Sequence, residues 1–411
     1  MPLSFDQKLD RYAELIVRKG VNLQRGQRLH VTCPLEAAIL GRRVTDAAYR
    51  AGAKLVEVHW TDDHVNLSRY RYAAPDTFDE IPTARANALI EGANRGDALL
   101  TIYASDPDLL KNESQELVAE VQRMTQEYMK GYSSLVMANR VHWCVTSAPI
   151  AAWAARVFPD EATDAQVPKL WDAIFSAVRA DLEDPVAAWD EHVAHLGRRR
   201  AHLNERQFDA LHYTGPGTDF TVGLPKNHTW MGGGGKGPHG HIFIANMPTE
   251  EVFTLPHRER AEGKVSSTRP LSYAGTLIDD FTLTFAGGKV VDARAAKGED
   301  TLRRLLATDE GSARLGEVAL VPHSSPISAS RVMFFNTLFD ENASCHLAVG
   351  RAYSKCLEGG PEMSPEEFAT AGGNDSLAHV DFMVGSADLD IDGLSEDGTA
   401  HPLLRGGEWV D

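Results

Sequence analysis

The first 150 residues alternate short apolar runs with longer amphipathic stretches, and this alternation restricts the fold more than any other feature. Residues 28–33 and 54–60 are typical of strands and flank a predicted helix over 35–51. The strand pattern recurs at 98–103 and 142–146. A strand, helix and strand in succession form a parallel pair joined by a crossover helix. The sequence therefore predicts an N-terminal α/β region with a mostly parallel sheet.

The pattern changes after about residue 205, where short β-like segments and glycines replace helical sequence. Gly287 and Gly288 separate two such segments, 281–285 and 290–293, and a glycine pair in this position is typical of a tight hairpin. We expect a second region rich in antiparallel strands, so the fold class is α/β, α+β overall. The expected domains are residues 1–205 and 206–411.

Charge and composition exclude several classes of protein. The 411 residues include 41 Lys and Arg and 58 Asp and Glu, a formal net charge of −17, so we expect no nucleic-acid partner and no membrane partner. No apolar run is long enough to span a bilayer, and the N-terminus lacks the unbroken apolar stretch of a signal peptide, which predicts a cytoplasmic protein. The four cysteines form no Cys-x-x-Cys pair, which favours reduced, mostly buried thiols.

Nucleotide-binding motifs are missing or incomplete. No Gly-x-Gly-x-x-Gly follows any of the predicted strands. The glycine run 232–237 contains Lys236, but no Ser or Thr follows it and Pro238 prevents the helix that a phosphate-binding loop needs. Neither a dinucleotide site nor a phosphate-binding loop is expected.

The segment 378–385 introduces the candidate chemistry. If it is a strand, His379 and Asp381 share one face, whereas Val380 and Phe382 take the other. An imidazole nitrogen and a carboxylate oxygen so placed can both reach one divalent ion, such as Zn²⁺ or Co²⁺. The alternative is a core histidine with an aspartate beside it. Further potential ligands in the C-terminal half favour the metal site.

Two acidic stretches supply some of these ligands. Glu250 and Glu251 follow a Pro-Thr turn, where we expect one of the two to be a solvated turn residue. Glu317 stands at the start of an otherwise apolar strand. A carboxylate there is costly unless it is paired or ligated, which favours a functional role for Glu317.

A third stretch carries His346 and Tyr353, which are two helical turns apart and would share a face if the segment were helical. Glu341 would then lie just before that helix or in its first turn, where the helix N-terminus favours a negative charge. The alternative for Tyr353 alone is core packing.

Together these residues form a carboxylate-rich set that includes histidine. Six ligands exceed the need of one tetrahedral ion with an open position, so we interpret the set as two divalent ions bridged by a carboxylate and a water or hydroxide. Such a pair suits amide hydrolysis, because it activates water and stabilises an oxyanion. The six residues are Glu251, Glu317, Glu341, His346, His379 and Asp381.

Four motifs in this half resemble the thermophilic-type metallo-aminopeptidases known as aminopeptidase T, aminopeptidase S and aminopeptidase II. In order they are MPTEEVFT at 247–254, GEVALV at 316–321, DENASCHLA at 340–348 and HVDFMVG at 379–385. The resemblance extends over most of the chain. It implies a two-domain fold, a co-catalytic pair of zinc, cobalt or magnesium ions, and a homodimer whose active sites face an enclosed cavity.

By motif position, the resemblance implies that Glu251 rather than Glu250 is a ligand and that Tyr353 takes part in catalysis. Glu341 can be a metal ligand or the general base, and the identity of the bridging carboxylate stays open. The expected activity is that of a metallo-aminopeptidase acting on small peptides with a free N-terminus. The alternatives are a two-metal hydrolase of another amide or ester, and a non-catalytic peptide-binding or metal-binding protein on the same scaffold.

Overall fold

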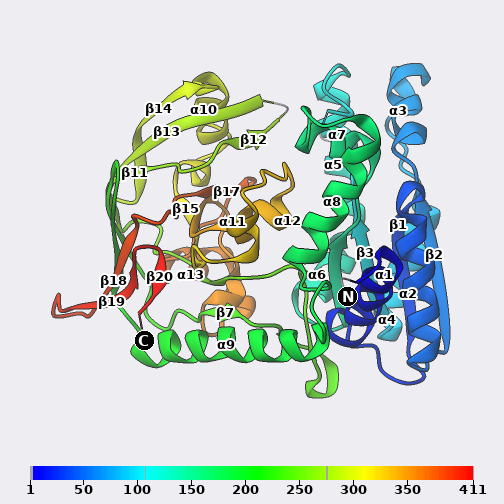
Figure 1. The fold of residues 1–411 in the computed structure, drawn as a ribbon. Helices are drawn as coiled ribbons and strands as arrows, with labels where there is room; N and C mark the ends of the chain where they lie inside the picture. The colour runs from blue at the N-terminus through cyan, green and yellow to red at the C-terminus, as the bar shows by residue number, and fades with distance from the viewer. Residues whose placement is uncertain (1–2, 107, 275, 411) are drawn as a thin grey trace. The chain divides into compact units, whose positions relative to one another are not determined.

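The structure is a computed structural model that describes residues 3–106, 108–274 and 276–410 (Figure 1). It contains two compact units, and the chain passes between them more than once. Unit 1 comprises Met1–His192 and Gly234–Pro248, and unit 2 comprises Val193–Gly233 and Thr249–Asp411. The division into domains at residue 205 stays a prediction.

Unit 1 is built on a four-stranded parallel sheet with the order β2-β1-β3-β4. The strands are β1 (Arg28–Pro34), β2 (Leu55–Thr61), β3 (Ala98–Tyr103) and β4 (Trp143–Ser147). Every neighbouring pair is parallel. The reason is that the helical segments between the strands return the chain to the end of the sheet at which each strand begins. The predicted parallel sheet is therefore confirmed.

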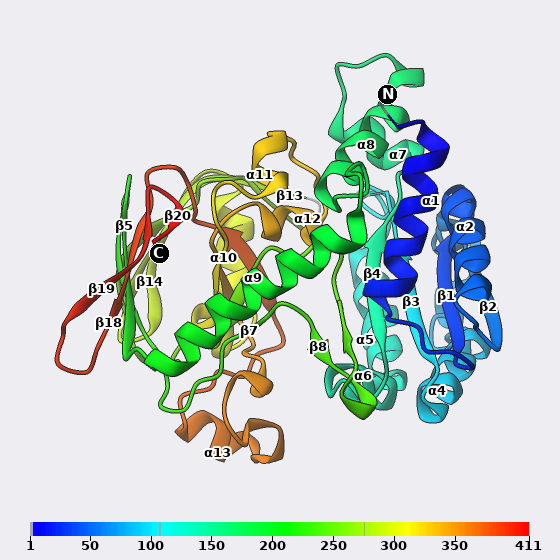
Figure 2. The same cartoon turned by 60° about the horizontal axis from the view of Figure 1, so that its bottom comes forward.

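Helices pack against this sheet. Helix α2 packs on β1 and β2, and α1 packs on α2 (Figure 2). The side chain of Ser4 accepts a hydrogen bond from the backbone N–H of Gln7, so Ser4 is the N-cap of α1. The helices are α1 (Phe5–Leu15), α2 (Ala38–Arg50), α3 (Asp63–Tyr72), α4 (Thr83–Arg95), α5 (Gln115–Tyr128), α6 (Lys130–Met137), α7 (Ala151–Val157) and α8 (Thr163–Ala177). The next helix, α9 (Pro185–Arg206), continues into unit 2, and a short pair, β8 (Gly235–Lys236) and β9 (Ile242–Phe243), completes unit 1.

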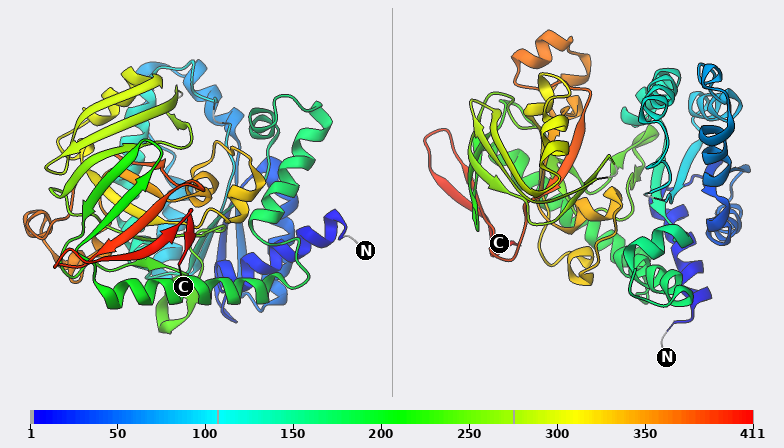
Figure 3. Two further views of the ribbon diagram at one scale, coloured as in Figure 1. Left: turned by 60° about the vertical axis from the view of Figure 1, so that its left-hand side comes forward. Right: turned by 90° about the horizontal axis from the view of Figure 1, so that it is seen from above.

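Unit 2 contains two antiparallel sheets (Figure 3). The nine-stranded sheet has the order β12-β13-β11-β6-β5-β18-β19-β20, with β14 beside β13. Its strands are β5 (Ala210–Gly215), β6 (Thr218–Gly223), β11 (Ala261–Ser266), β12 (Leu271–Tyr273), β13 (Thr276–Ala286), β14 (Lys289–Lys297), β18 (Asp390–Leu394), β19 (Ala400–Arg405) and β20 (Glu408–Trp409). The five-stranded sheet has the order β17-β16-β15-β10-β7. Its strands are β7 (Met231–Gly232), β10 (Val252–Thr254), β15 (Leu315–Leu320), β16 (His346–Gly350) and β17 (His379–Met383).

One apolar core joins the two sheets of unit 2. It takes Leu211 and Phe220 from the nine-stranded sheet, and Leu347 and Phe382 from the five-stranded sheet. Because one face of the five-stranded sheet is committed to this core, its other face is left for polar side chains. Four short helices complete the unit: α10 (Glu299–Leu306), α11 (Pro326–Ser330), α12 (Thr337–Asp340) and α13 (Pro365–Thr370).

The predicted hairpin at Gly287 and Gly288 is confirmed. Strands β13 and β14 pair up to Ala286 and Lys289, and the two glycines between them have φ of 58° and 75°. A Cβ on Gly288 would lie 2.1 Å from the carbonyl oxygen of Arg258, so this turn needs glycine for space as well as for conformation.

Two further sequence expectations meet the structure here. All four cysteines are buried and none is in a disulfide, as predicted. Within the described part of the chain, no helix combines the length and the apolar character that a bilayer crossing needs.

Candidate metal centre

One face of the five-stranded sheet carries most of the predicted ligands. The strand register places Glu317 of β15 beside Ala348 of β16, and Ala348 beside Asp381 of β17. His346 and His379 lie two residues from members of this row, so they share its face. The alanine between the two carboxylates leaves space at the centre of the group. The predicted strand at 378–385, with His379 and Asp381 on one side, is confirmed.

A β-bulge at Gly316 directs Glu317 toward this face. The pairing of β15 with β16 shifts between Leu315 and Glu317, so one residue of β15 is left over. A Cβ on Gly316 would lie 2.3 Å from the carbonyl oxygen of Arg351, and only glycine fits there. Bulges re-aim neighbouring side chains and are frequent beside functional sites.

Glu251 reaches the same place from the residue before β10. Its Oε2 atom lies 3.2 Å from Nε2 of His346, is buried, and has no hydrogen-bond partner among the described residues. Glu250 is buried as well, so the expectation that one of the pair is a solvated turn residue is wrong. The reason is that the backbone N–H of Glu250 donates to Oδ1 of Asn342 at 2.7 Å, which draws the segment into the interior.

Asn342 is a positioning residue whose role no sequence pattern predicts. It is fully buried. Its Oδ1 accepts from Glu250. Its Nδ2 donates to the carbonyl oxygen of Leu338 at 3.0 Å and to Oε1 of Glu341 at 3.4 Å. Asn342 thereby ties the backbone before Glu251 to the side chain of Glu341. Its presence in the 340–348 motif is the only sequence signal, and an asparagine there is equally typical of a turn.

Both histidines present Nε2 to the carboxylates. Nδ1 of His346 lies 3.2 Å from the carbonyl oxygen of Ser344, and Nδ1 of His379 lies 2.7 Å from that of Arg351. Because a carbonyl oxygen only accepts, each Nδ1 carries the proton and donates it. Once a metal ion displaces the second proton, Nε2 of each imidazole offers its lone pair. Hydrogen bonds of this kind orient histidines that bind metals.

The ligand atoms form two groups that share Glu317. Glu251, Glu317 and His346 each offer an atom within 4.8 Å of the others, and so do Glu317, His379 and Asp381. The two oxygens of the shared carboxylate face different histidines: Oε1 is 3.6 Å from Nε2 of His346 and Oε2 is 3.7 Å from Nε2 of His379. A carboxylate so placed is suited to bridge two cations.

The residues fit divalent metal ions. Each group combines carboxylate oxygens with one imidazole nitrogen, a donor set that zinc and other first-row ions accept. The buried, unpartnered oxygen of Glu251 is costly unless a cation compensates it.

The pKa shifts of the clustered carboxyl groups also favour a bound cation. Burial, with the charges of Asp381 and Glu251, raises the pKa of Glu317 to about 7. Burial and the same two carboxylates raise the pKa of Glu341 well above its usual value. Burial is the largest influence on Asp381 and raises its pKa, but the hydrogen bond with His379 and the charges of His379 and His346 together outweigh burial, and the net pKa is lowered. The cluster is therefore short of positive charge.

The segment from Glu341 to Tyr353 does not form the continuous helix on which a shared face for His346 and Tyr353 would depend. Glu341–Ala343 is a single 3-10 turn after α12, His346–Gly350 is strand β16, and Tyr353 follows in a loop. All five residues of β16 are buried because β15 and β17 flank it. An inner strand has a continuous apolar run, which periodicity alone cannot distinguish from a buried helix.

Tyr353 and Glu341 nevertheless lie beside the two groups. The ring centroid of Tyr353 is 5.0 Å from that of His379 and 6.1 Å from that of Phe253. Burial and the nearby carboxylates raise the pKa of Tyr353 far above its ordinary value, so its hydroxyl stays protonated and is able to donate. Glu341 is outside both three-residue groups, although its charge interacts with Glu251, Asp381 and His346.

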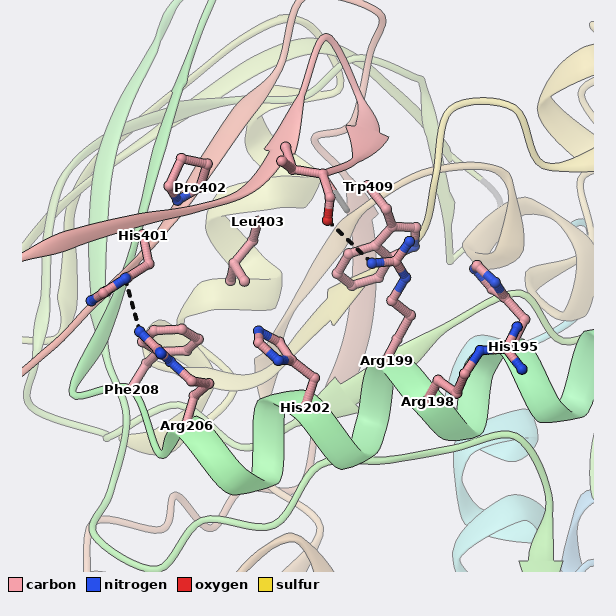
Figure 4. Close-up of a pocket in the computed structure, with 11 residues that line it drawn as sticks. His195, Arg198, Arg199, His202, Arg206, Phe208, His401, Pro402, Leu403 and Trp409 are labelled. Atoms are coloured by element: carbon pink, nitrogen blue, oxygen red, sulfur yellow. Dashed lines mark hydrogen bonds between the residues drawn. The ribbon is translucent and has the colours of Figure 1, made fainter.

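A cavity of about 640 Å³ elsewhere in unit 2 has a different character (Figure 4). Helix α9 and strands β19 and β20 line it with basic groups, among which Arg206 donates to Nδ1 of His401 at 2.8 Å. No described residue that lines it is acidic. Because guanidinium groups repel cations, this cavity is not a metal site.

Comparison with known proteins connects this centre to a family. Residues 5–409 match the family model described as thermophilic metalloprotease (M29). The chain is 48% identical over 406 residues to aminopeptidase 2 of Geobacillus stearothermophilus, a match covering 99% of this chain and 98% of that one. It is 47% identical over 407 residues to aminopeptidase AmpS of Bacillus subtilis (strain 168), covering 99% of each. The solved structure of wild-type AmpT from Thermus thermophilus matches with a TM-score of 0.94 at 43% identity, covering 99% of this chain and 100% of that chain.

We expect metal ions to stabilise the protein more as the pH rises. The pKa of Glu317 is raised from 4.5 to about 7 and that of His379 from 6.5 to about 9. A group with a raised pKa stabilises the fold while it holds its proton, and that stabilisation is lost as the pH rises through the raised value. The metal-free protein should therefore lose stability between about pH 5 and about pH 9, and metal ions, which displace these protons, should restore it.

The measurement is the melting temperature with and without Co²⁺ across this pH range. An increase in melting temperature on adding Co²⁺ that is the same at every pH would contradict the expectation.

Proposed function

The chain belongs to the thermophilic metalloprotease family M29, and from this premise we propose that it is a metallo-aminopeptidase that releases the N-terminal residue of small peptides through a co-catalytic pair of divalent ions. The observation that carries the proposal is the pair of ligand groups that share Glu317. No observation favours the other readings, a hydrolase of different amides or esters or a non-catalytic binding protein.

The proposed ligand sets follow the two groups. Glu251, Glu317 and His346 would hold one ion, and Glu317, His379 and Asp381 the other, with Glu317 as the bridging carboxylate. When bound, such a pair supplies Lewis acidity that polarises the scissile carbonyl and makes water a stronger nucleophile at neutral pH. Because each group contains an imidazole, zinc or cobalt suits it better than magnesium, which prefers oxygen ligands.

Glu341 is proposed as the group that carries the proton from the attacking water to the leaving amine. Its position supports this role, because it borders both ligand groups without belonging to either. Asn342 donates to Glu341 Oε1 and orients the carboxylate. Proton transfer by a positioned carboxyl group is typical of amide hydrolysis at metal sites. Direct ligation by Glu341 is the alternative.

Tyr353 is proposed to donate a hydrogen bond to the oxyanion that develops on the scissile carbonyl. Its raised pKa keeps the proton on the hydroxyl throughout the working pH range, which an oxyanion donor requires. The ring contact with His379 holds Tyr353 beside the second ligand group.

The homodimer that the family resemblance implies also remains a proposal.

Removal of metal should abolish the activity. Dialysis against a chelator should stop the release of N-terminal residues, and Co²⁺ or Zn²⁺ should restore it, because the proposed chemistry depends on both ions. Elemental analysis of the active protein should give two ions per chain. N-terminally acetylated peptides serve as the control substrate and should stay intact. Full activity of the metal-free protein, or equal cleavage of acetylated and free peptides, would falsify the proposal.

Replacement of Glu341 by Gln separates its two proposed roles. If Glu341 carries the proton, Glu341→Gln should keep two ions per chain while kcat falls by about 10²-fold or more. The matched control is Glu396→Gln, which should leave kcat unchanged, because the side chain of Glu396 is 75% exposed and follows β18 of the other sheet. A variant that binds only one ion would instead identify Glu341 as a ligand.

Tyr353→Phe removes one hydroxyl and leaves the ring contacts. We expect kcat to fall by about 10²-fold while the metal content and melting temperature hold, since the lost hydrogen bond is made to the transition state. Tyr72→Phe is the control, because the side chain of Tyr72 is 82% exposed on α3. An unchanged kcat would remove Tyr353 from the mechanism.

A further inference from the structure

A cavity of about 270 Å³ lies directly beside the second ligand group. His379 and Asp381 form part of its wall, so it borders the proposed metal centre. The remaining wall comes from the segment around β12, from other residues of β17, and from α12 and the loop before it. The loop contributes Met333, Phe335 and Asn336, and α12 contributes Thr337 and Asp340. Pockets for whole drug-sized ligands measure roughly 300–1,000 Å³. The cavity lies near the lower end of this range and has room for one large side chain of a substrate.

The lining of this cavity is largely apolar. Its polar members are mostly occupied within the protein. Asp340 accepts hydrogen bonds from the backbone N–H groups of Phe334 and Asn336, at 2.9 and 3.0 Å. The side chain of Asn336 accepts from the N–H of Leu338 at 3.1 Å. The apolar side chains in the wall are Pro270, Leu271, Tyr273, Met333, Phe335, Val380, Phe382 and Met383.

The loop that carries Phe335 is fixed by hydrogen bonds and by a ring contact. Its φ is 53°, a left-handed conformation that is uncommon for a bulky residue and costs free energy. The two hydrogen bonds of Asp340 bracket it on either side, at Phe334 and Asn336. The ring of Phe334 stacks on Phe339 of α12 at 4.6 Å, which anchors the same loop. The loop is therefore built to keep Phe335 where it is.

We propose that this cavity receives the side chain of the N-terminal residue and selects large apolar side chains such as those of Leu, Met and Phe. Phe335 and Met333 are the specificity-determining residues. The inference rests on the proposed function, because an aminopeptidase places the amino group and scissile carbonyl of one residue at its metal ions. The side chain of that residue is then the part of the substrate nearest to His379 and Asp381.

The charged residues of the cavity wall also favour an apolar substrate side chain. No Lys or Arg is among the described residues that line the cavity, whereas Asp340 is. Away from the metal centre, an acidic substrate side chain would face the carboxylate of Asp340 with no Lys or Arg to pair with. A basic side chain would need a free acceptor, but the oxygens of Asp340 already accept two backbone N–H groups. Apolar side chains need no partner there.

The test is a panel of amino-acid amides assayed with the metal-loaded enzyme. Wild type should cleave Leu, Met and Phe amides with a kcat/KM about tenfold or more above that for Ala, Asp or Arg amides. Phe335→Ala should lower kcat/KM for the large apolar amides by about tenfold and leave that for Ala amide within about twofold. Val291→Ala, in an exposed position of β14, is the matched control and should change nothing.

Two further variants guard against a folding defect. Phe335→Asn removes the ring but tolerates the left-handed backbone, and Met333→Ala changes a different part of the wall. Each should show the same selective loss with unchanged metal content and melting temperature. Equal losses on every amide, a preference for Arg amide, or selectivity that follows the second residue of dipeptides would overturn the assignment. Cleavage of no free amide would instead mean that the proposed function itself fails.

Discussion

Crowding of buried carboxylates against two imidazoles is the constraint on which unit 2 depends. Glu251, Glu317, Glu341 and Asp381 converge there, and burial together with the neighbouring negative charges raises the pKa of Glu317 and Glu341. Proteins rarely maintain such a cluster without a compensating cation. The need for positive charge therefore explains in one step the raised pKa values, the unpartnered oxygen of Glu251 and the orientation of both histidines.

The sheet makes this crowding possible. Pairing of β15, β16 and β17 places the ligands at fixed cross-strand spacings, while the opposite face of the same strands is buried in the apolar core. A ligand on a strand that is packed on one side and hydrogen-bonded along both edges has little freedom to move. Regular pairing alone does not orient Glu317 and Glu251. The bulge at Gly316 orients Glu317, and the hydrogen bond from Glu250 to Asn342 positions the segment that carries Glu251.

Rigid and adaptable parts are separated in this arrangement. The proposed ligands belong mostly to paired strands, whereas the cavity beside them also takes in the loop residues Met333 and Phe335. Loops tolerate substitution better than paired strands do. Substitutions at these two positions would therefore change the cavity without moving the strands of the proposed metal site.

The sequence by itself determined the local features. Periodicity located the parallel strands of unit 1, the Gly287–Gly288 hairpin and the strand that sets His379 beside Asp381, and residue type marked Glu317 as a carboxylate out of place in an apolar strand. Each of these depends on neighbours in the chain. Only the tertiary structure decided that His346 belongs to a strand, that Glu317, Ala348 and Asp381 form one row, that Asn342 orients Glu341, and that Phe335 lines a cavity. The physical reason is that strand register and cavity walls are set by burial and pairing between segments far apart in the chain, and a local pattern carries no information about which segment will be its partner.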